Sequence, residues 1–226
     1  MSCSPPSTFG RETFINKVRA KYPFSALHIV WSQLDKDAKT ILDVGCGQGE
    51  PMSFINKRRN FKVTGVDLFQ PYLEKARRKA IYQDLINCNA LSLPFEDKTF
   101  DAVICMELLE HLEQTDGILL LDELERVARK QILLTTPTGK YEQDAYDGNS
   151  YQEHKFLWTP ESLRSYGYKI RGTGIKGLPR SEIKSSIIRY LRDGTYALGG
   201  IVSFSLPQLG CHVVGDKKLN HNSKGT

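Results

Sequence analysis

ILDVGCGQGE, residues 41–50, joins a short apolar run to a loop that contains three glycines. Glycine reaches backbone conformations with positive φ, and it lacks the Cβ atom that would keep a ligand away from the backbone. In open α/β sheets, ligands bind beyond the carboxyl ends of the strands, and this loop directly follows such an end. The stretch therefore predicts the first strand of an α/β sheet and, behind it, a loop that binds a ligand.

Strand-like and helix-like segments alternate at regular spacing from this stretch to residue 137. Pro51 and Pro71 suit the first turns of two helices, and Asp116 suits the cap of a third. Alternation of this kind implies a parallel sheet with helices on both faces. We expect strands over 40–44, 61–66, 85–89, 100–106 and 131–135, and helices over 51–59, 71–80 and 116–130.

The two ends of the chain depart from this alternation. Residues 11–35 carry apolar positions at helical spacing, interrupted by Pro23, and predict one or two helices. Residues 138–158 are polar and aromatic without a clear period, which is typical of a substrate-side loop or lid. Beyond them we expect a helix from Pro160 capped by Thr159, a strand near 168–172, a helical stretch over 181–192 and a last strand over 211–217.

The bulk composition predicts one domain and no nucleic-acid partner. A chain of 226 residues, 40% of them hydrophobic, suits a single α/β domain, which we expect over residues 11–220. The Pro- and Ser-rich residues 1–10 and the tail 221–226 are expected to be disordered. The 31 basic and 26 acidic side chains give a net charge of +5 without a dense basic patch, which disfavours nucleic acid as a partner.

The five cysteines lie far apart and form no CxxC pair. This spacing argues against a zinc site and against a disulfide framework, so we expect no metal. The N-terminal residues lack the pattern of a signal peptide, and no apolar run approaches the roughly 20 residues of a membrane span. These features predict a cytoplasmic protein without a membrane span, and they leave the oligomeric state open.

Three features separate the glycine loop from the similar loop of dinucleotide-binding folds. Asp43 places a carboxylate inside the motif. The glycines are spaced GxGxG, and Glu50 and Pro51 follow where a pyrophosphate-binding helix would need small, uncharged residues. Asp67 ends the second expected strand, where a carboxylate can accept hydrogen bonds from both hydroxyls of a ribose. The pattern favours a nucleoside cofactor other than NAD.

With these residues the sequence resembles the class I S-adenosylmethionine-dependent methyltransferases, in particular the group typified by the ubiquinone and menaquinone methyltransferases. The resemblance covers residues 39–137 and rests on ILDVGCGQGE, VTGVDLF, NALSLPFEDKTFDAVIC and MELLEHL. It implies a doubly wound, mostly parallel, seven-stranded Rossmann-like sheet with strand order 3-2-1-4-5-7-6 and helices on both faces. It also implies S-adenosyl-L-methionine as the cofactor and methyl transfer as the activity.

The resemblance assigns roles to residues around the expected pocket. Gly45 and Gly47 would line the methionine and ribose portion of the cofactor, and Asp43 would lie close to its amino group. Asp67 would hold the ribose, and Leu68 would pack on the adenine. The complete set of expected cofactor-binding residues is Asp43, Gly45, Cys46, Gly47, Gly49, Asp67, Leu68, Asn89, Ala90, Met106 and Glu107.

Asn89 and Ala90 stand where the family usually has an aspartate and a small residue. The amide oxygen of Asn89 can accept the same hydrogen bond from the adenine amino group, so the departure removes a charge and keeps the acceptor. Met106 and Glu107 follow the fourth expected strand and would close the pocket. For Asp67 an alternative role stays open, as a cap of the helix that follows it.

The transfer of a methyl group from a sulfonium is an in-line displacement that mainly needs an aligned acceptor and a dry site. A general base is needed only where the acceptor keeps its proton at neutral pH, as a hydroxyl does. His154 and His111 are the candidate bases, because imidazole titrates near neutrality, and each has packing as its alternative role. Tyr146, Asp147 and Tyr151 are expected on the substrate side.

Several functions are consistent with this sequence, and a small-molecule acceptor is favoured. The segment CMELLEH after the fourth expected strand lacks the [DNS]PP[YFW] motif, which argues against methylation of nucleobase amino groups. The alternatives are a methyltransferase acting on RNA or protein, an NAD-dependent oxidoreductase, and a non-catalytic cofactor-binding subunit. The YDGNSYQEH segment and the WTPE that follows resemble an uncharacterised prokaryotic subgroup of these methyltransferases, which implies no acceptor.

Overall fold

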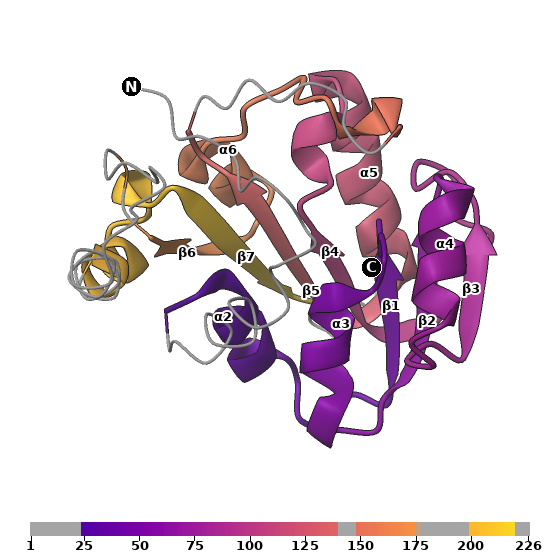
Figure 1. The fold of residues 1–226 in the computed structure, drawn as a ribbon. Helices are drawn as coiled ribbons and strands as arrows, with labels where there is room; N and C mark the ends of the chain where they lie inside the picture. Colours follow the sequence, from indigo (N-terminus) through magenta and orange to yellow (C-terminus); the bar gives the residue numbers. More distant parts are fainter. Residues whose placement is uncertain (1–23, 140–147, 175, 177–198, 220–226) are drawn as a thin grey trace, which may run out of the picture.

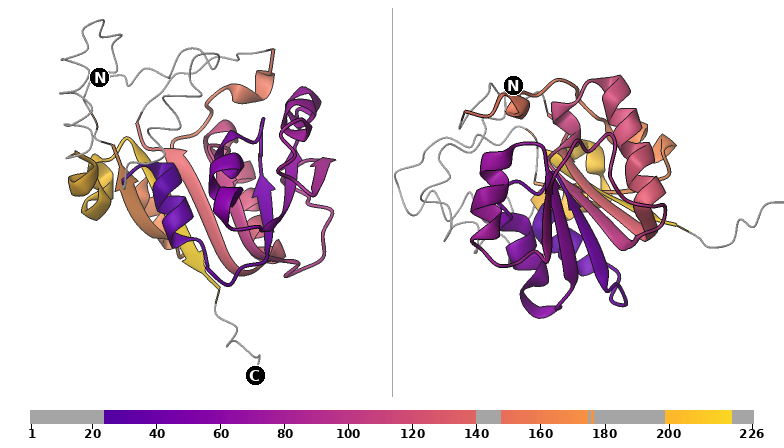
Figure 2. Two further views of the ribbon diagram at one scale, coloured as in Figure 1. Left: turned by 60° about the horizontal axis from the view of Figure 1, so that its bottom comes forward. Right: turned by 90° about the vertical axis from the view of Figure 1, so that its right-hand side faces the viewer.

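The structure is a computed structural model that describes residues 24–139, 148–174, 176 and 199–219. Its strands form a seven-stranded sheet in the order β3-β2-β1-β4-β5-β7-β6, with helices on both sides (Figure 1, Figure 2). This is the strand order expected from the sequence. The strands are β1 (Thr40–Val44), β2 (Lys62–Asp67), β3 (Asp84–Asn87), β4 (Phe100–Met106), β5 (Ala128–Pro137), β6 (Lys169–Thr173) and β7 (His212–Lys218).

The sheet is parallel except at one edge. β1 pairs in parallel with β2 and β4, and the pairs β2–β3 and β4–β5 are also parallel. β7 runs antiparallel to both β5 and β6, so the sheet is mostly parallel, as expected. The parallel strands end at the same edge, where their carboxyl ends place the loops that follow β1, β2 and β4 next to one another.

The helices are short and match the expected positions within a few residues, except for a helical segment over residues 199–205 that was not expected. Thr159 caps α6 in a capping box with Ser162, as the sequence predicts. The labelled helices are α2 (Ala26–Gln33), α3 (Glu50–Ile55), α4 (Gln70–Arg77), α5 (Gln114–Val127) and α6 (Pro160–Ser165). The 3₁₀ turns are η1 (Asn56–Arg58), η2 (Leu109–His111), η3 (Ser150–Gln152) and η4 (Pro207–Leu209).

Two helix ends differ from the expectation, and the first is that of α4, which ends at Arg77 and not at residue 80. α5 ends at Val127, and β5 begins at Ala128, so the expected helix to residue 130 is wrong by three residues. The chain leaves the helical path at Ala128 because this residue pairs with Phe100 of β4, and the Arg129 guanidinium then lies 2.9 Å from Asp101 on that strand. Asp116 lies in the first turn of α5 without capping it, because Glu113 occupies the N-cap position. The expected helical stretch over 181–192 and the expected disordered ends lie outside the described residues.

The core lies on both faces of the sheet, and β4 supplies both layers. Because side chains alternate along a strand, Val103 and Cys105 face one side while Ala102 and Ile104 face the other. The first layer packs beneath α5 and α6, and the second packs beneath α2 and α3. Within the described residues, no helix is long and apolar enough to cross a membrane.

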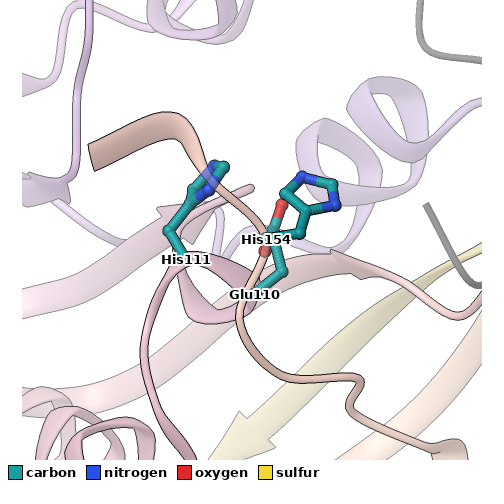
Figure 3. Close-up of side chains that lie close together, drawn as sticks. All are labelled: Glu110, His111 and His154. Carbon is teal, nitrogen blue, oxygen red and sulfur yellow. The ribbon is translucent and has the colours of Figure 1, made fainter. Parts of the chain in front are cut away.

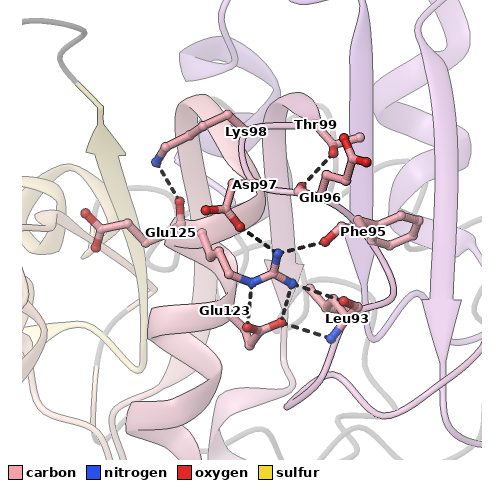
Figure 4. Close-up of polar contacts among 9 residues, drawn as sticks. Leu93, Phe95, Glu96, Asp97, Lys98, Thr99, Glu123 and Glu125 are labelled. Carbon is pink, nitrogen blue, oxygen red and sulfur yellow. Dashed lines mark hydrogen bonds and ion pairs between the residues drawn. The ribbon is translucent and has the colours of Figure 1, made fainter.

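Arg126 of α5 holds the long connection between β3 and β4, and Figure 4 shows the labelled residues Leu93, Phe95, Asp97 and Glu123 around this contact. Its guanidinium donates to the carbonyl oxygens of Leu93 at 3.0 Å and Phe95 at 2.7 Å. It also pairs with Asp97 at 3.0 Å and with Glu123 at 2.8 Å. Glu123 in turn accepts the Leu93 amide at 2.9 Å. This network fixes the segment that runs from the expected adenine side of the pocket into β4.

Gly117 of α5 lies against the buried ring of Trp158, and a Cβ atom added there would stand 2.4 Å from Trp158 Cζ2. Alanine favours a helix over glycine by about 0.5–1 kcal/mol, whereas overpacking a core costs about 1–3 kcal/mol. We therefore expect Gly117→Ala to lower the free energy of unfolding by about 1–2 kcal/mol in denaturant titrations. Leu119→Ala, at a 52% exposed site on the same helix, is the control and should change it by about 0.5 kcal/mol or less. A more stable Gly117→Ala variant would contradict this packing.

Candidate functional site

The loop between β1 and α3 turns through three left-handed glycines. Gly45, Gly47 and Gly49 have φ values of 70°, 52° and 80°, a region that other residues enter at a cost. The amides of Gly45 and Cys46 donate to the carbonyl oxygen of Val66 at 2.9 and 3.0 Å, which anchors the loop on β2. The sequence-predicted glycines therefore serve the turn itself. The side chains of Leu108 and Tyr82 fill the space beside Gly45 and Gly49, whereas Gly47 leaves the backbone open to close approach.

Asp67, the last residue of β2, connects this loop to the next one. One of its carboxylate oxygens accepts the amide of Gly47 at 2.8 Å, and the other accepts the amide of Phe69 at 2.8 Å. Burial raises the pKa of Asp67, and the two amides counteract this shift. A carboxylate has about four acceptor positions, so further hydrogen bonds from ligand hydroxyls remain feasible. Phe69, not Asp67, takes the N-cap position of α4.

Asp43 is buried in β1, with 4% of its surface exposed, and it accepts a hydrogen bond of 2.6 Å from the Tyr82 hydroxyl. Burial raises the pKa of Asp43 to about 7, although the hydrogen bond from Tyr82 acts in the opposite direction. Tyr82 lies between α4 and β3 and was not predicted to be part of the site. The signal for it in the sequence is Gly65, because a glycine inside a buried strand marks a close approach.

The expected adenine side shows one exposed apolar residue and one turn. Leu68 is 43% exposed directly after Asp67, which suits a residue that packs on a ligand. Asn89 is exposed, and its side-chain oxygen accepts the Leu91 amide at 3.0 Å. Asn87 was not predicted, yet its amide group donates to the carbonyl oxygens of Asp67 and Leu68 at 2.9 and 2.8 Å. It therefore fixes the turn that presents Leu68.

Glu107 follows β4 with a left-handed φ of 52°, and its side chain turns toward β5 and β7. Its carboxylate accepts the Thr135 hydroxyl at 2.7 Å and lies 3.4 Å from His212 Nε2. Desolvation opposes the charged forms of Glu107 and His212, but the attraction between the two side chains stabilises both charges. The pKa of Glu107 is lowered by His212, and Glu107 raises the pKa of His212 to about 10. Met106 packs against the core layer beneath α2 and α3. His212 is a further residue that sequence reasoning missed.

The two candidate bases lie side by side, together with a buried carboxyl group (Figure 3). The ring centroids of His111 and His154 are 4.9 Å apart. One potential ligand atom from each of Glu110, His111 and His154 lies within 4.8 Å of the other two. Glu110 and His111 are 2% and 8% exposed. We call these three residues the Glu–His–His cluster.

Hydrogen bonds to backbone carbonyl oxygens join the turn that carries Glu110 and His111 to the segment that carries His154. The amide of Lys155 donates to the Glu110 carbonyl oxygen at 2.8 Å. His111 Nδ1 donates to the Glu153 carbonyl oxygen at 3.0 Å. Because a carbonyl oxygen only accepts, the neutral ring of His111 carries its proton on Nδ1 and its lone pair on Nε2. The segment that carries His154 is thus attached to η2, which the sequence does not reveal.

The cluster has the chemistry of a base or of a cation site. Burial raises the pKa of Glu110 well above its usual range, and the charge of Glu107 adds to this. Burial also lowers the pKa of His111, which keeps its imidazole neutral. Two imidazoles and one carboxyl group are ligands that divalent transition metals accept. The sequence predicted no metal from the spacing of its cysteines. The combination of Glu110, His111 and His154 becomes visible only in the folded chain.

The residues expected on the substrate side are only partly described. Tyr151 lies in η3 and is 55% exposed, three residues before His154. Tyr146 and Asp147 lie outside the described residues. Leu108 connects the two halves of the site, because a Cβ atom added to Gly45 would stand 3.0 Å from its side chain. The glycine loop and the turn that carries Glu110 and His111 are therefore neighbours.

The raised pKa of Glu110 predicts a pH-dependent effect of Glu110→Gln. A folded state that holds this proton more tightly than the unfolded chain loses stability as the pH rises above the unfolded pKa of about 4.3. Glutamine cannot lose that proton, so the melting temperature of Glu110→Gln minus that of the wild type should grow between about pH 5 and pH 8. A change of about 1 kcal/mol in the free energy of unfolding shifts the melting temperature of a chain of this size by about 2–4 °C. The measurement is thermal unfolding in the presence of a chelator.

Glu161→Gln on α6 is the matched control, because Glu161 is an exposed carboxylate paired with the neighbouring Arg164. Its effect should not grow with pH over the same range. A constant difference between Glu110→Gln and the wild type would contradict a protonated Glu110 in the folded protein.

Sequence comparison relates the chain to methyltransferases. A family model described as a methyltransferase domain matches residues 41–131. A ubiquinone biosynthesis O-methyltransferase of Rickettsia typhi is 27% identical over 165 residues, which cover 70% of this chain and 64% of the relative. The corresponding enzyme of Coxiella burnetii is 37% identical over 130 residues, which cover 56% of this chain and 48% of the relative. The chain thus spans less than two thirds of the length of these curated relatives.

Solved structures share the fold at low sequence identity. A methyltransferase of Thermotoga maritima, described as a possible histamine N-methyltransferase, superposes with a TM-score of 0.60 at 17% identity, covering 92% of this chain and 98% of its own. An S-adenosylmethionine-dependent methyltransferase of Archaeoglobus fulgidus gives a TM-score of 0.54 at 20% identity, covering 91% and 100%. These likenesses extend the fold beyond residues 41–131 to nearly the whole chain.

Proposed function

We propose that this chain, which belongs to the class I S-adenosylmethionine-dependent methyltransferases, transfers the methyl group to an oxygen atom of a small-molecule acceptor. The observation that carries the oxygen acceptor is the Glu–His–His cluster, which lies beside the glycine loop at the carboxyl end of β4. The curated relatives named as O-methyltransferases support the same class of acceptor.

On the cofactor side, the loop after β1 and the end of β2 supply the groups that a nucleoside cofactor needs. Gly47 is held by Asp67 and has open space where a side chain would begin, so its backbone can lie against the ligand. Asp67 offers a carboxylate for the ribose hydroxyls, and Leu68 offers an exposed apolar side chain for the adenine. When bound, S-adenosylmethionine supplies an activated methyl group.

On the acceptor side, the cluster provides what an oxygen nucleophile requires. A hydroxyl keeps its proton at neutral pH, so the site must remove that proton or stabilise its loss. The neutral imidazole of His111, with its lone pair on Nε2, and the neighbouring His154 can take up a proton. The buried Glu110 carboxyl group, held by the Thr136 hydroxyl at 3.1 Å, fixes the polar wall behind them.

The same three side chains also suit a divalent cation, which would lower the pKa of a bound hydroxyl. The hydrogen bond from His111 Nδ1 to the Glu153 carbonyl oxygen is of the kind that orients metal-binding histidines. Bonds of about 2.0–2.2 Å bring the ligand atoms of zinc within about 4.4 Å of one another. That separation is an upper limit, and tetrahedral geometry brings the ligand atoms to about 3.4 Å from one another. The spacing of up to 4.8 Å would therefore have to close by more than about 1 Å, through side-chain rotation.

A transfer assay with radiolabelled S-adenosylmethionine tests the proposed function. Small molecules, RNA and protein from cell extract are offered as separate fractions, and label is expected in the small-molecule fraction only. His154→Ala should lower the transfer rate by about 100-fold or more, the range that a general base contributes. Glu153→Gln is the control, because Glu153 contributes its backbone oxygen and its side chain is exposed.

The same assay distinguishes the two roles of the cluster. If transfer falls with a chelator and returns with Zn²⁺ or Mn²⁺, the cluster acts through a cation; if a chelator has no effect, it acts as a base. Label in RNA or protein would contradict a small-molecule acceptor. Unchanged transfer by His154→Ala would contradict a role of the cluster in the reaction.

A further inference from the structure

Tyr82 makes a directed contact with the floor of the glycine loop. It lies between α4 and β3, where the amide of the next residue, Gln83, donates to the Val63 carbonyl oxygen at 2.8 Å. Its side chain crosses β2, and its hydroxyl donates to Oδ2 of Asp43 in β1 at 2.6 Å. Burial raises the pKa of Tyr82, with the negative charge of Asp43 adding to the shift, so the hydroxyl keeps its proton and acts as the donor.

Two glycines from separate segments leave the space that the Tyr82 ring occupies. A Cβ atom at Gly49 would stand 2.8 Å from the ring, and one at Gly65 would also stand 2.8 Å from it. Gly65 is the residue of β2 that pairs with Asp43 of β1. The ring therefore crosses β2 at the one position that gives its hydroxyl access to Asp43.

This contact constrains the orientation of one carboxylate and leaves it capacity for another partner. A carboxylate accepts about four hydrogen bonds, and Tyr82 is the side chain that bonds to Asp43 here. Asp43 stands two residues before Gly45, and the negative charge of Asp67 adds to the burial that raises its pKa. A fixed, buried carboxylate at this position is suited to a cationic group of the ligand.

S-adenosylmethionine carries two cationic groups, an ammonium on its amino-acid portion and the sulfonium. We propose that Tyr82 is a positioning residue, which orients Asp43 so that its carboxylate binds the ammonium group of the cofactor. The proposal rests on the proposed function, because it assumes that this cofactor binds at the glycine loop. Tyr82 itself touches neither the methyl group nor the acceptor.

The test is calorimetric titration of wild-type protein and Tyr82→Phe with three ligands. S-adenosylmethionine has both cations, S-adenosylhomocysteine has only the ammonium, and 5′-methylthioadenosine has neither. Because Phe keeps the ring and removes only the hydroxyl, binding of the first two ligands should weaken by roughly fivefold to tenfold. Binding of 5′-methylthioadenosine should change by less than about twofold.

Tyr168→Phe is the matched control, since the Tyr168 hydroxyl is buried and has no hydrogen-bond partner among the residues that the structure describes. Its three affinities should equal those of the wild type. A second readout is the pH dependence of S-adenosylhomocysteine binding, which requires an ionised Asp43 and is lost as the pH falls through its pKa of about 7. The hydrogen bond lowers that pKa, so its removal should move this loss of affinity to higher pH.

The other titratable groups near Tyr82 do not account for this shift in the pH dependence of binding. Glu50 faces Tyr82 and is paired with Lys79, and Cys46 and Asp67 are unchanged in the variant. Equal weakening of all three ligands would overturn the proposal in favour of a packing role for Tyr82. Unchanged affinities would overturn it too, and weakening confined to S-adenosylmethionine would assign Asp43 to the sulfonium. Absence of wild-type binding of all three ligands would instead contradict the proposed function.

Discussion

The hydrogen bond from the Gly47 amide to the Asp67 carboxylate is the interaction on which the site depends. It joins the loop after β1 to the end of β2, and the second oxygen of the same carboxylate holds the turn before α4. The loop can make this bond because three glycines take left-handed conformations. The parallel pairing of β1 with β2 and β4 then places the turn after β4 beside it. The glycine loop and the Glu–His–His cluster, the two parts of the proposed site, are thus positioned by one sheet edge.

Desolvation and the interactions between neighbouring charges give the polar groups at this edge different protonation states. Glu107 and His212 stabilise each other as an ion pair, whereas Glu110 and His111 are driven toward their neutral forms. Neutral imidazoles are able to accept a proton or a metal ion, and charged ones are not. The arrangement therefore separates a fixed ion pair, which braces the strand ends, from a cluster that can react.

Local patterns in the sequence predicted the strands and the glycine loop, because buried strands and tight turns restrict residue types at each position. The strand order was predicted by the family resemblance, since pairing between distant strands leaves no local pattern. Asp67 could be found from a local pattern too, since it ends a strand beside the loop. Tyr82, Asn87 and His212 could not, because each reaches the site through a contact between segments distant in the chain. His111 and His154 were each predicted, but not their proximity, which depends on backbone hydrogen bonds between residues 110–111 and 153–156.

Competitive calorimetry tests the central claim, that the loop held by Asp67 binds S-adenosylmethionine. Wild-type protein is titrated with S-adenosylmethionine and with NADH, and the first titration is repeated with Asp67→Ala. The account predicts micromolar binding of S-adenosylmethionine, no binding of NADH, and an affinity reduced by about tenfold or more in the variant, as expected when a hydrogen-bonding carboxylate is lost. Binding of NADH without binding of S-adenosylmethionine would contradict it.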